Sequence, residues 1–314
     1  MITSYQEIME NGYEVIIIGA GPAAWSAAIF LVRAGISTLV IGKDSESGLA
    51  DAADVRNFPG FPDGVSGRML LDSFMTQAKK QGALHVEDEV THTEKQGEGF
   101  IVKTSNLSEF IGKYLVLAHG ANYIKANLPG EKEFAGNGVH YCALCDGPIY
   151  KDKDVMVLGN GSLAAEEASE LSVYCKNVKI ITHSPQKNIS PEYEEFLKSK
   201  NIEVTLGKAG EIKGENGKAA SLILENGSEV KFDGLFIALG VASSMNFAQK
   251  LGLELKNNFI KVDQDMRTSV SGVWSIGIGR GGVNQIVKSV GDGGVAAVDI
   301  IKVAKGLPNY IDHT

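Results

Sequence analysis

The first regular pattern along the chain is an apolar run, Tyr13 to Ile18 (YEVIII), whose β-branched side chains predict a buried strand. The small-residue stretch GAGPAA follows, and WSAAIFLVRAG then has the apolar spacing of a helix that ends at Gly35. A second apolar run, Ser37 to Ile41, predicts another strand. Strand, glycine-rich turn, helix and strand in this order are typical of an α/β nucleotide-binding unit.

The same pattern returns later in the chain. Asp154 to Leu158 predicts a strand, GNGSLA is a second glycine-rich turn, AAEEASELSVY predicts a helix, and Val178 to Thr182 predicts the next strand. The hydrophilic stretch EIKGENGKAASLILENGSEV predicts a β-meander with Glu-Asn-Gly turns. We therefore expect an α/β fold with two Rossmann-like nucleotide-binding domains.

Other apolar runs indicate where the domain boundaries lie along the sequence. Tyr114 to Ala118 and Leu235 to Leu239 predict strands that end at glycine-containing segments, and QIVKSVGDGGVAAVDIIKVAKG predicts a helix rich in small residues. From the ends of these strands we place domain boundaries near residues 121 and 246.

Each glycine-rich turn has the spacing G-x-G-x-x-A. In the first turn, Gly19 allows a tight turn, Gly21 lets a pyrophosphate approach the backbone, and the small Ala24 lets the helix pack on the strand. The helix then begins with its N-terminus toward the phosphates. The alternative is a plain strand–turn–helix connection that binds no ligand.

The stretch HYCALCDGP contains two of the three cysteines, Cys142 and Cys145, followed directly by Asp146. Cysteines at this spacing form either a redox-active dithiol or half of a zinc site. A structural zinc site needs four ligands, and His140 is the one nearby candidate besides the cysteines, so we favour the dithiol and expect no metal. Cys175 has the pattern of a small core residue, and the isolated histidines at 85, 92 and 313 that of surface residues.

Composition and charge narrow the function classes. The formal net charge of -8 argues against nucleic acid or an anionic membrane as the main partner, since both need a basic surface. Apolar runs such as Val15 to Ile18 are far too short to cross a bilayer, and no basic, apolar leader precedes Tyr13. We therefore expect a cytoplasmic protein, in which a cysteine pair is more often catalytic than structural.

Taken together, the motifs resemble the low-molecular-weight thioredoxin reductase family, a group of FAD-dependent disulfide oxidoreductases. The resemblance covers nearly the whole chain and rests on motifs in a fixed order: GAGPAAWSAAI, VRNFPGFPDGVSG, LPGEKEFAGNGVHYCALCDGP, GNGSLAAEEA, DGLFIALG, TSVSGVWSIG and QIVKSVGDGGVAA. It implies an FAD-binding domain split between 1–121 and 247–314, and an inserted NAD(P)-binding-like domain, 122–246, that carries the cysteines. It also implies a homodimer and a thioredoxin-like protein as the disulfide substrate.

The resemblance assigns roles to individual residues. Cys145 would face the flavin, Cys142 would attack the partner's disulfide, and Asp146 would move protons to and from the thiolates as general acid and base. The alternative for Asp146 is a helix cap. The residues expected to contact the cofactors are Gly19, Gly21, Pro22, Ala23, Ala24, Gly42, Lys43, Asn57, His119, Gly120, Gly277, Ile278, Gln285 and Ile286 for FAD, and Gly159, Gly161 and Ala164 in the second glycine loop.

The chain departs from the family where the electron donor would bind. NADPH-using members carry H-R-R-x-x-x-R after the second strand of the inserted domain, and the arginines clamp the 2'-phosphate. Here the stretch is THSPQKNIS, so Ser184 and Pro185 replace two arginines, and Lys187 offers one charge without a bidentate clamp. We therefore expect a donor other than NADPH: the resemblance points to ferredoxin, to a second FAD or to a deazaflavin.

The flavin-binding segments also differ from the family. Its Gly-Gly-Gln is Glu46-Ser47-Gly48 here, its Ala-Thr-Gly is Ala118-His119-Gly120, and its Gly-Asp is Gly277-Ile278, in which isoleucine cannot accept the hydrogen bond of the flavin ribityl chain. We still expect FAD, one or two per chain. The main hypothesis is a disulfide oxidoreductase, and the alternative from another class is a flavin-binding redox sensor or partner-binding protein with little turnover.

Overall fold

The computed structural model describes residues 12–243, 251–257 and 259–307. The chain divides into two compact units, one made of Met1–Ala121 with Ser243–Thr314 and the other of Asn122–Ala242. The predicted boundary at residue 246 lies outside the described residues. In the part of the chain that is described, no helix is both long and apolar enough to span a membrane.

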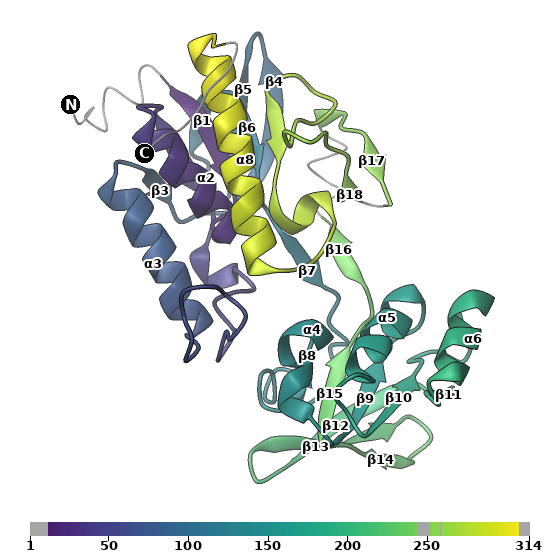
Figure 1. The fold of residues 1–314 in the computed structure, drawn as a ribbon. Helices are drawn as coiled ribbons and strands as arrows, with labels where there is room; N and C mark the ends of the chain where they lie inside the picture. Colours follow the sequence, from purple (N-terminus) through teal and green to yellow (C-terminus); the bar gives the residue numbers. More distant parts are fainter. Residues whose placement is uncertain (1–11, 244–250, 258, 308–314) are drawn as a thin grey trace. The chain divides into compact units, whose positions relative to one another are not determined.

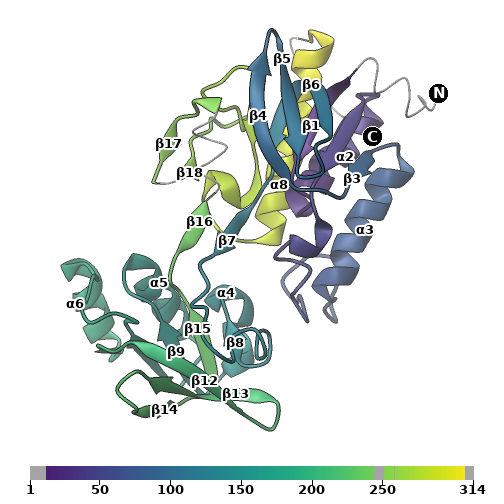
Figure 2. The same ribbon diagram turned by 180° about the vertical axis from the view of Figure 1, so that it is seen from behind.

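Unit 1 is built on a seven-stranded sheet with the strand order β3-β2-β1-β6-β5-β4, in which β19 also pairs with β6. Strands β1, β2, β3, β6 and β19 pair in parallel, whereas β4, β5 and β6 are antiparallel neighbours. Helices α2 and α8 pack side by side on one face of the sheet (Figure 1), and the opposite view shows β4 and β5 in front (Figure 2). The elements of unit 1 are β1 (Tyr13–Ile18), α2 (Pro22–Arg33), β2 (Thr38–Ile41), the 3-10 helix η1 (Asp44–Glu46), α3 (Gly67–Lys80), β3 (Leu84–Val86), β4 (Val90–Gln96), β5 (Gly99–Thr104), β6 (Glu109–Leu117), β17 (Leu255–Lys256), β18 (Phe259–Ile260), β19 (Val273–Ser275), the 3-10 helix η3 (Gly277–Arg280) and α8 (Ile286–Lys305).

Burial explains the apolar run of β1. Val15 and Ile17 point into the core formed with α2 and α8, whereas Ile16 and Ile18 point into a second core on the other face of the sheet. Because successive side chains of a strand point to opposite faces, the part of β1 that is covered on both sides, Val15 to Ile18, is apolar at every position, whereas Glu14 near the strand's start is exposed. The predicted strand over residues 13–18 is confirmed with the same bounds.

Unit 2 has a five-stranded parallel sheet with the order β11-β10-β9-β15-β8 and a three-stranded antiparallel sheet, β12-β13-β14. Helix α5 packs on one face of the parallel sheet, and residues of β12 and β13 share the core on the other face. A two-stranded sheet of β7 (Ala121–Tyr123) and β16 (Val241–Ser243) lies where the chain passes between the units. The elements of unit 2 are β8 (Val139–His140), α4 (Ala143–Asp146), the 3-10 helix η2 (Gly147–Tyr150), β9 (Asp154–Leu158), α5 (Ser162–Leu171), β10 (Asn177–Ile181), α6 (Pro191–Ser199), β11 (Glu203–Thr205), β12 (Ala209–Glu215), β13 (Lys218–Leu224), β14 (Glu229–Lys231) and β15 (Gly234–Ile237).

The α/β class and the two nucleotide-type units agree with the sequence-based expectation. The predicted meander is present as β12, β13 and β14, and its first turn contains Asn216 and Gly217, both with positive φ (53° and 78°). Asparagine and glycine tolerate this left-handed conformation, which is why such a pair marks a tight hairpin.

Candidate functional site

The cysteine pair lies at the start of helix α4, directly after the edge strand β8. Cys142 has an extended backbone (φ -145°, ψ 108°) and precedes the helix, and Cys145 lies within it. The two sulfur atoms are joined in a disulfide, and the backbone N–H of Cys145 donates to Sγ of Cys142 at 3.2 Å. Two cysteines held this close by α4 can cycle between disulfide and dithiol.

Asp146 faces a buried histidine. Its carboxylate makes no capping hydrogen bond to η2, which excludes the helix-cap alternative, and its Oδ2 lies 3.2 Å from Nδ1 of His140. The other ring nitrogen of His140, Nε2, lies 2.7 Å from the hydroxyl of Tyr150. His140, which the sequence suggested only as a zinc ligand, therefore contacts the predicted acid/base residue. Nowhere in the described ranges do three or more His, Cys, Asp or Glu side chains gather as a metal site would require.

A second carboxyl group, Glu167, reaches the same helix from α5. It accepts a hydrogen bond from the backbone N–H of Ala143, the first residue of α4. Burial raises the pKa of Glu167 to about 7, against the opposing effect of that hydrogen bond and with help from the nearby negative charges of Glu170, Glu166 and Asp146. Glu167 has no distinctive signal in the sequence, because paired glutamates on a helix are ordinary surface residues, and its contact with α4 arises only in the folded unit.

The second glycine loop connects β9 to α5 and has the geometry of a nucleotide-binding turn. A Cβ atom on Gly159 would lie 2.2 Å from the carbonyl oxygen of Ala238, and Gly161 has a φ of 139°, so both positions require glycine. Ala164 is fully buried against this turn. Between the glycines, Asn160 donates from Nδ2 to the carbonyl of Gln186 (2.8 Å) and accepts from the N–H of Asn188 (2.7 Å). The turn is thereby tied to the segment that replaces the arginine clamp.

That replacement segment, 182–190, offers no free cation for a phosphate among its described side chains. Lys187 pairs with Glu194 at 2.8 Å. Nδ1 of His183 accepts the backbone N–H of Ala209 at 3.0 Å, and burial lowers the pKa of this histidine. Both groups are engaged within unit 2, so the single charge expected from Lys187 is offset by a carboxylate.

The first glycine loop, between β1 and α2, fits the pyrophosphate of FAD. A Cβ on Gly19 would lie 2.2 Å from the carbonyl oxygen of Ala118, whereas a Cβ on Gly21 would meet nothing closer than Oγ of Ser47 at 3.6 Å. Helix α2 begins at Pro22 without a side-chain cap, so backbone N–H groups of its first turn are free of capping side chains. Such a terminus binds phosphate oxygens, and the residues present therefore suit the expected group.

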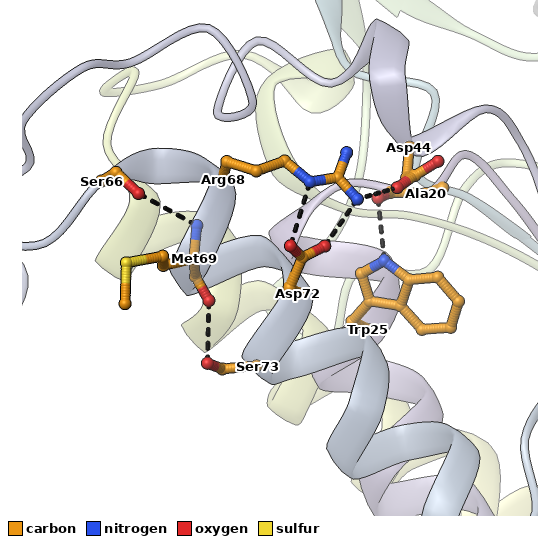
Figure 3. A network of polar contacts seen from close by, with 8 residues as sticks. All are labelled: Ala20, Trp25, Asp44, Ser66, Arg68, Met69, Asp72 and Ser73. Atoms are coloured by element: carbon orange, nitrogen blue, oxygen red, sulfur yellow. Dashed lines mark hydrogen bonds and ion pairs between the residues drawn. The ribbon is translucent and has the colours of Figure 1, made fainter.

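A polar network around Arg68 holds η1, the short helix after β2 (Figure 3). The guanidinium of Arg68, on α3, bonds the carboxylates of Asp72 and of Asp44 in η1, the latter at 2.6 Å. Burial would raise the pKa of Asp44, but the hydrogen bond and charge of Arg68 outweigh it and lower the pKa. Beside this network, Nε1 of Trp25 donates to the carbonyl of Ala20 at 2.9 Å and anchors the glycine turn to α2.

Candidate FAD contacts from distant parts of the chain meet at the carboxyl ends of the parallel strands. Nδ2 of Asn57 donates to Oε1 of Gln285 at 2.9 Å, across 228 positions of sequence. His119 follows β6, and a Cβ on Gly279 in η3 would lie 2.8 Å from its Nε2, so the ring lies against η3, which also contains Ile278. Burial lowers the pKa of His119 to about 4, which keeps the imidazole neutral at physiological pH. The remaining candidates lie at strand ends or at the starts of helices. Gly42 and Lys43 follow β2, and Gly120 follows His119. The others begin helices: Pro22, Ala23 and Ala24 in α2, Gly277 in η3 and Ile286 in α8.

The segment around Ile278 is held by a charged cluster that sequence analysis missed. Buried Asp292, on α8, accepts the backbone N–H of Gly277 at 3.0 Å and pairs with Arg280 and Lys288. Nζ of Lys288 also donates to the carbonyls of Gly277 and Gly281, both at 2.7 Å. The spacing of Lys288 and Asp292 at i and i+4 on a helix was the available signal. The turn is thus fixed without a carboxylate at position 278.

One surface assignment is wrong. His85 is half-buried, its Nε2 lies 2.9 Å from the carbonyl oxygen of Gly42, and its ring meets the indole of Trp25 edge-on. It therefore supports the turn after β2 instead of facing solvent. His92 pairs with Glu94 on an exposed part of β4, and His313 lies outside the described residues.

Comparisons with known proteins agree with this arrangement. Residues 13–293 match the family model described as pyridine nucleotide-disulphide oxidoreductase. The chain is 34% identical over 307 residues to thioredoxin reductase of Bacillus subtilis, a match that covers 93% of this chain and 94% of the relative.

Solved structures give the same result. Thioredoxin reductase of Streptococcus pyogenes superposes with a TM-score of 0.87 at 28% identity, over 94% of this chain and 99% of that one. The atypical thioredoxin reductase TRi of Desulfovibrio vulgaris Hildenborough is 35% identical with a TM-score of 0.54, over 95% of this chain and 100% of that one. Because the match extends from β1 into α8 and includes the cysteine pair, the chain belongs to the pyridine nucleotide-disulphide oxidoreductases and is a flavin disulfide oxidoreductase of the low-molecular-weight thioredoxin reductase type.

Proposed function

We propose that the protein passes two electrons from bound FAD through Cys142 and Cys145 to the disulfide of a thioredoxin-like protein, with a donor other than NADPH. The observation that carries this proposal is the disulfide at the start of α4, directly followed by a carboxylate that contacts a buried histidine. The relatives' name, thioredoxin reductase, supports a thioredoxin-like acceptor. By the same resemblance we propose a homodimer.

The residues of unit 1 would hold the cofactor. The N-terminus of α2 and Gly21 would bind the pyrophosphate, and the Asn57–Gln285 pair and the turn at Gly277 would border the flavin end. FAD, when bound, supplies the two-electron chemistry that reduces the disulfide. The protein contributes position and charge, and here the ribityl chain would lack the usual carboxylate because Ile278 stands in its place.

The dithiol step uses groups of unit 2. In the reduced enzyme, the thiolate of Cys142 attacks one sulfur of the partner's disulfide, and the partner's other sulfur leaves as a thiolate. Cys145, deprotonated by Asp146, then attacks Sγ of Cys142, which breaks the mixed disulfide and releases the second partner thiolate. Two electrons pass to the partner, and the two protons that the enzyme thiols lose are taken up by the partner's two sulfurs.

The donor proposal rests on the second glycine loop. The segment 182–190 has no arginine, Lys187 is paired with Glu194, and Asn160 ties the loop to this segment. A 2'-phosphate would find no bidentate partner there. We therefore propose reduction by ferredoxin or through a second bound flavin.

The first experiment is an anaerobic titration of the purified protein with NADPH, in which the flavin absorption band is followed after bound flavin per chain has been counted. We expect the band to persist with NADPH and NADH and to bleach with dithionite. A count near two flavins would favour the second-flavin route, and a count near one the ferredoxin route. Bleaching by stoichiometric NADPH would refute the donor proposal.

The disulfide step is tested separately with Cys142→Ser. We expect this variant to lose reduction of a thioredoxin-like substrate with any donor, whereas Cys175→Ser, which alters the one cysteine outside the pair, should keep it. Full activity of Cys142→Ser would contradict the role assigned to Cys142. The alternative function, a redox sensor with little turnover, is excluded if the wild-type protein reduces the substrate catalytically.

A further inference from the structure

We propose that His140 is a positioning residue that orients the carboxylate of Asp146 and holds the proton which Asp146 exchanges with the dithiol, with Tyr150 fixing the imidazole. This inference rests on the proposed function, in which Asp146 is the acid and base of the cysteine pair. The three side chains come from one continuous stretch of unit 2, which runs from the end of β8 through α4 and η2.

The imidazole of His140 is held on every side. Its exposed fraction is 6%, and its ring stacks on Phe236 and meets Tyr150 edge-on, with centroids 5.3 Å apart in both cases. Nδ1 lies 3.2 Å from Oδ2 of Asp146, and Nε2 lies 2.7 Å from the Tyr150 hydroxyl. Because the ring is buried and both of its nitrogens are engaged, the imidazole has one orientation. Its contact with Asp146 therefore fixes the direction in which that carboxylate points.

The same contacts suit two protonation states. When Asp146 is protonated and His140 is neutral, Nδ1 accepts from the carboxyl O–H and Nε2–H donates to the oxygen of Tyr150. In the cation, both ring N–H groups donate, Nδ1–H to the carboxylate of Asp146 and Nε2–H to the same oxygen of Tyr150. The imidazole can therefore take up a proton without any heavy atom moving, which a group that stores a proton during turnover requires.

Several other charged or titratable groups lie near the side chains of His140, Asp146 and Tyr150. Burial raises the pKa of Tyr150, and Asp146, Asp233 and Cys175 act in the same direction. Burial likewise raises the pKa of Tyr123, with contributions from Glu167, Asp146 and Glu170, and Nζ of Lys218 lies 4.8 Å from the centroid of the Tyr150 ring. Both tyrosines stay neutral at physiological pH.

The proton path follows from the dithiol step. When Cys145 loses its proton to Asp146, the carboxyl group can pass that proton to Nδ1 of His140 and regain its negative charge. The imidazole then returns the proton through Asp146 to the partner's departing thiolate, which completes the transfer of two protons to the partner. No further oxidant or reductant is needed, because only the location of one proton changes.

The test measures the chain's own thiols, so it needs neither donor nor partner. The FAD-bound protein is reduced with excess dithiothreitol, exchanged into buffers spanning about pH 5 to 9, and alkylated with iodoacetamide, and the rate is plotted against pH. We expect the wild type to show an imidazole inflection, between about pH 5 and 8, besides the thiol inflection. His140→Gln keeps one N–H donor but cannot take up a proton, and it should lose the imidazole inflection.

Two further variants separate positioning from folding. Tyr150→Phe keeps the packing and removes only the hydroxyl, and it should shift the imidazole inflection without abolishing it. His92→Asn, on the exposed edge of β4, should leave the profile unchanged. Circular dichroism identifies any variant that has not folded. A folded His140→Gln protein with the wild-type profile would overturn the proposal. This result differs from failure of the proposed function, which would appear as retained disulfide-reductase activity in Cys142→Ser.

Discussion

At the scale of single residues, the start of α4 is held by a carboxyl group, Glu167, that its neighbours shield from water. Glu167 is held at a pKa of about 7 because burial penalises its charged form more than the hydrogen bond from Ala143 stabilises it. Its ordinary value is 4.5, so folding raises the pKa. The folded protein therefore binds a proton here that the unfolded chain releases, and this carboxyl group stabilises the fold only while it is protonated.

We predict that Glu167→Gln changes the pH dependence of stability in unit 2. The contribution of Glu167 is fully present below pH 4.5 and is lost as pH rises through about 7. Glutamine stays neutral and can still accept the Ala143 N–H, so the variant should match the wild type near pH 4.5 and exceed it at pH 8 by at most about 3 kcal/mol of unfolding free energy. Urea unfolding of the oxidised proteins at several pH values measures the difference. Glu195→Gln, on the exposed side of α6, is the control; a Glu167→Gln difference that does not vary with pH would contradict the prediction.

How far residues could be predicted depends on how local their signal is. Cys142, Cys145 and Asp146 were found because their chemistry lies in one short motif. Glu167 and Lys288 were missed because each acts on a segment that only tertiary packing brings to it: Glu167 on the N–H of Ala143 and Lys288 on the carbonyls of a turn before its own helix. The sequence does reveal Ile278 as a departure, but not the Asp292 cluster that fixes the turn around it.

At the scale of elements, α3 holds η1, the short helix after β2, without containing a candidate FAD contact. It begins at Gly67 behind the cap Ser66, whose hydroxyl accepts the N–H of Met69, and this start places Arg68 within reach of η1 (Figure 3). Asp44, the first residue of η1, is buried with 8% exposure and depends on Arg68 for its compensating charge. A buried carboxylate without that partner would cost stability or move toward water and carry η1 with it.

We predict that Arg68→Met weakens FAD binding as well as stability. The variant keeps most of the side-chain length but leaves Asp44 without its cation, so the segment after β2, with Lys43, should no longer be held against the glycine turn. Flavin fluorescence during reconstitution of the apoprotein measures the dissociation constant, which should rise, and the melting temperature should fall. Lys80→Met, on the exposed last turn of the same helix, should change neither. Unchanged FAD affinity in Arg68→Met would show that η1 is positioned by other contacts.

The bounds of strands with a strong local apolar pattern were predicted closely. Strands that are defined by pairing with distant strands were not predicted. β9 has the predicted bounds, and β10 begins one residue before the predicted start at Val178. The antiparallel strands β4 and β5 were not predicted. Most side chains of β4 are exposed, and β4 is defined by its pairing with β5, which in turn pairs with β6. Helix α3 was missed for a related reason, because its apolar stripe is narrow and much of its surface is polar.

At the scale of the whole molecule, the two units repeat one design but carry different chemistry. Each has a parallel sheet with a glycine turn before a helix, yet the cysteine pair belongs to unit 2 and the candidate FAD contacts outside the second loop belong to unit 1. Both tryptophans, Trp25 and Trp274, are buried in unit 1. Indole fluorescence therefore reports on one unit, whereas circular dichroism reports on both.

This separation allows cofactor binding to be tested for each unit in one experiment. A ligand that binds only the folded form of unit 1 stabilises that unit by about 2.7 kcal/mol at a hundredfold excess over its dissociation constant, which corresponds to about 5 to 10 °C for a domain of this size. We therefore predict that FAD added to the apoprotein raises the melting temperature seen by tryptophan fluorescence, and that on the ferredoxin route a second transition, seen only by circular dichroism, stays in place. If FAD also raised that second transition, the glycine loop of unit 2 would bind flavin as well, since a ligand stabilises only what it binds or what unfolds together with it. Cys142→Ser, which alters unit 2 alone, separates these two causes. If the units unfold together, a single transition appears in both signals and any loss of stability lowers it in both. If the units unfold separately, the fluorescence transition must not move.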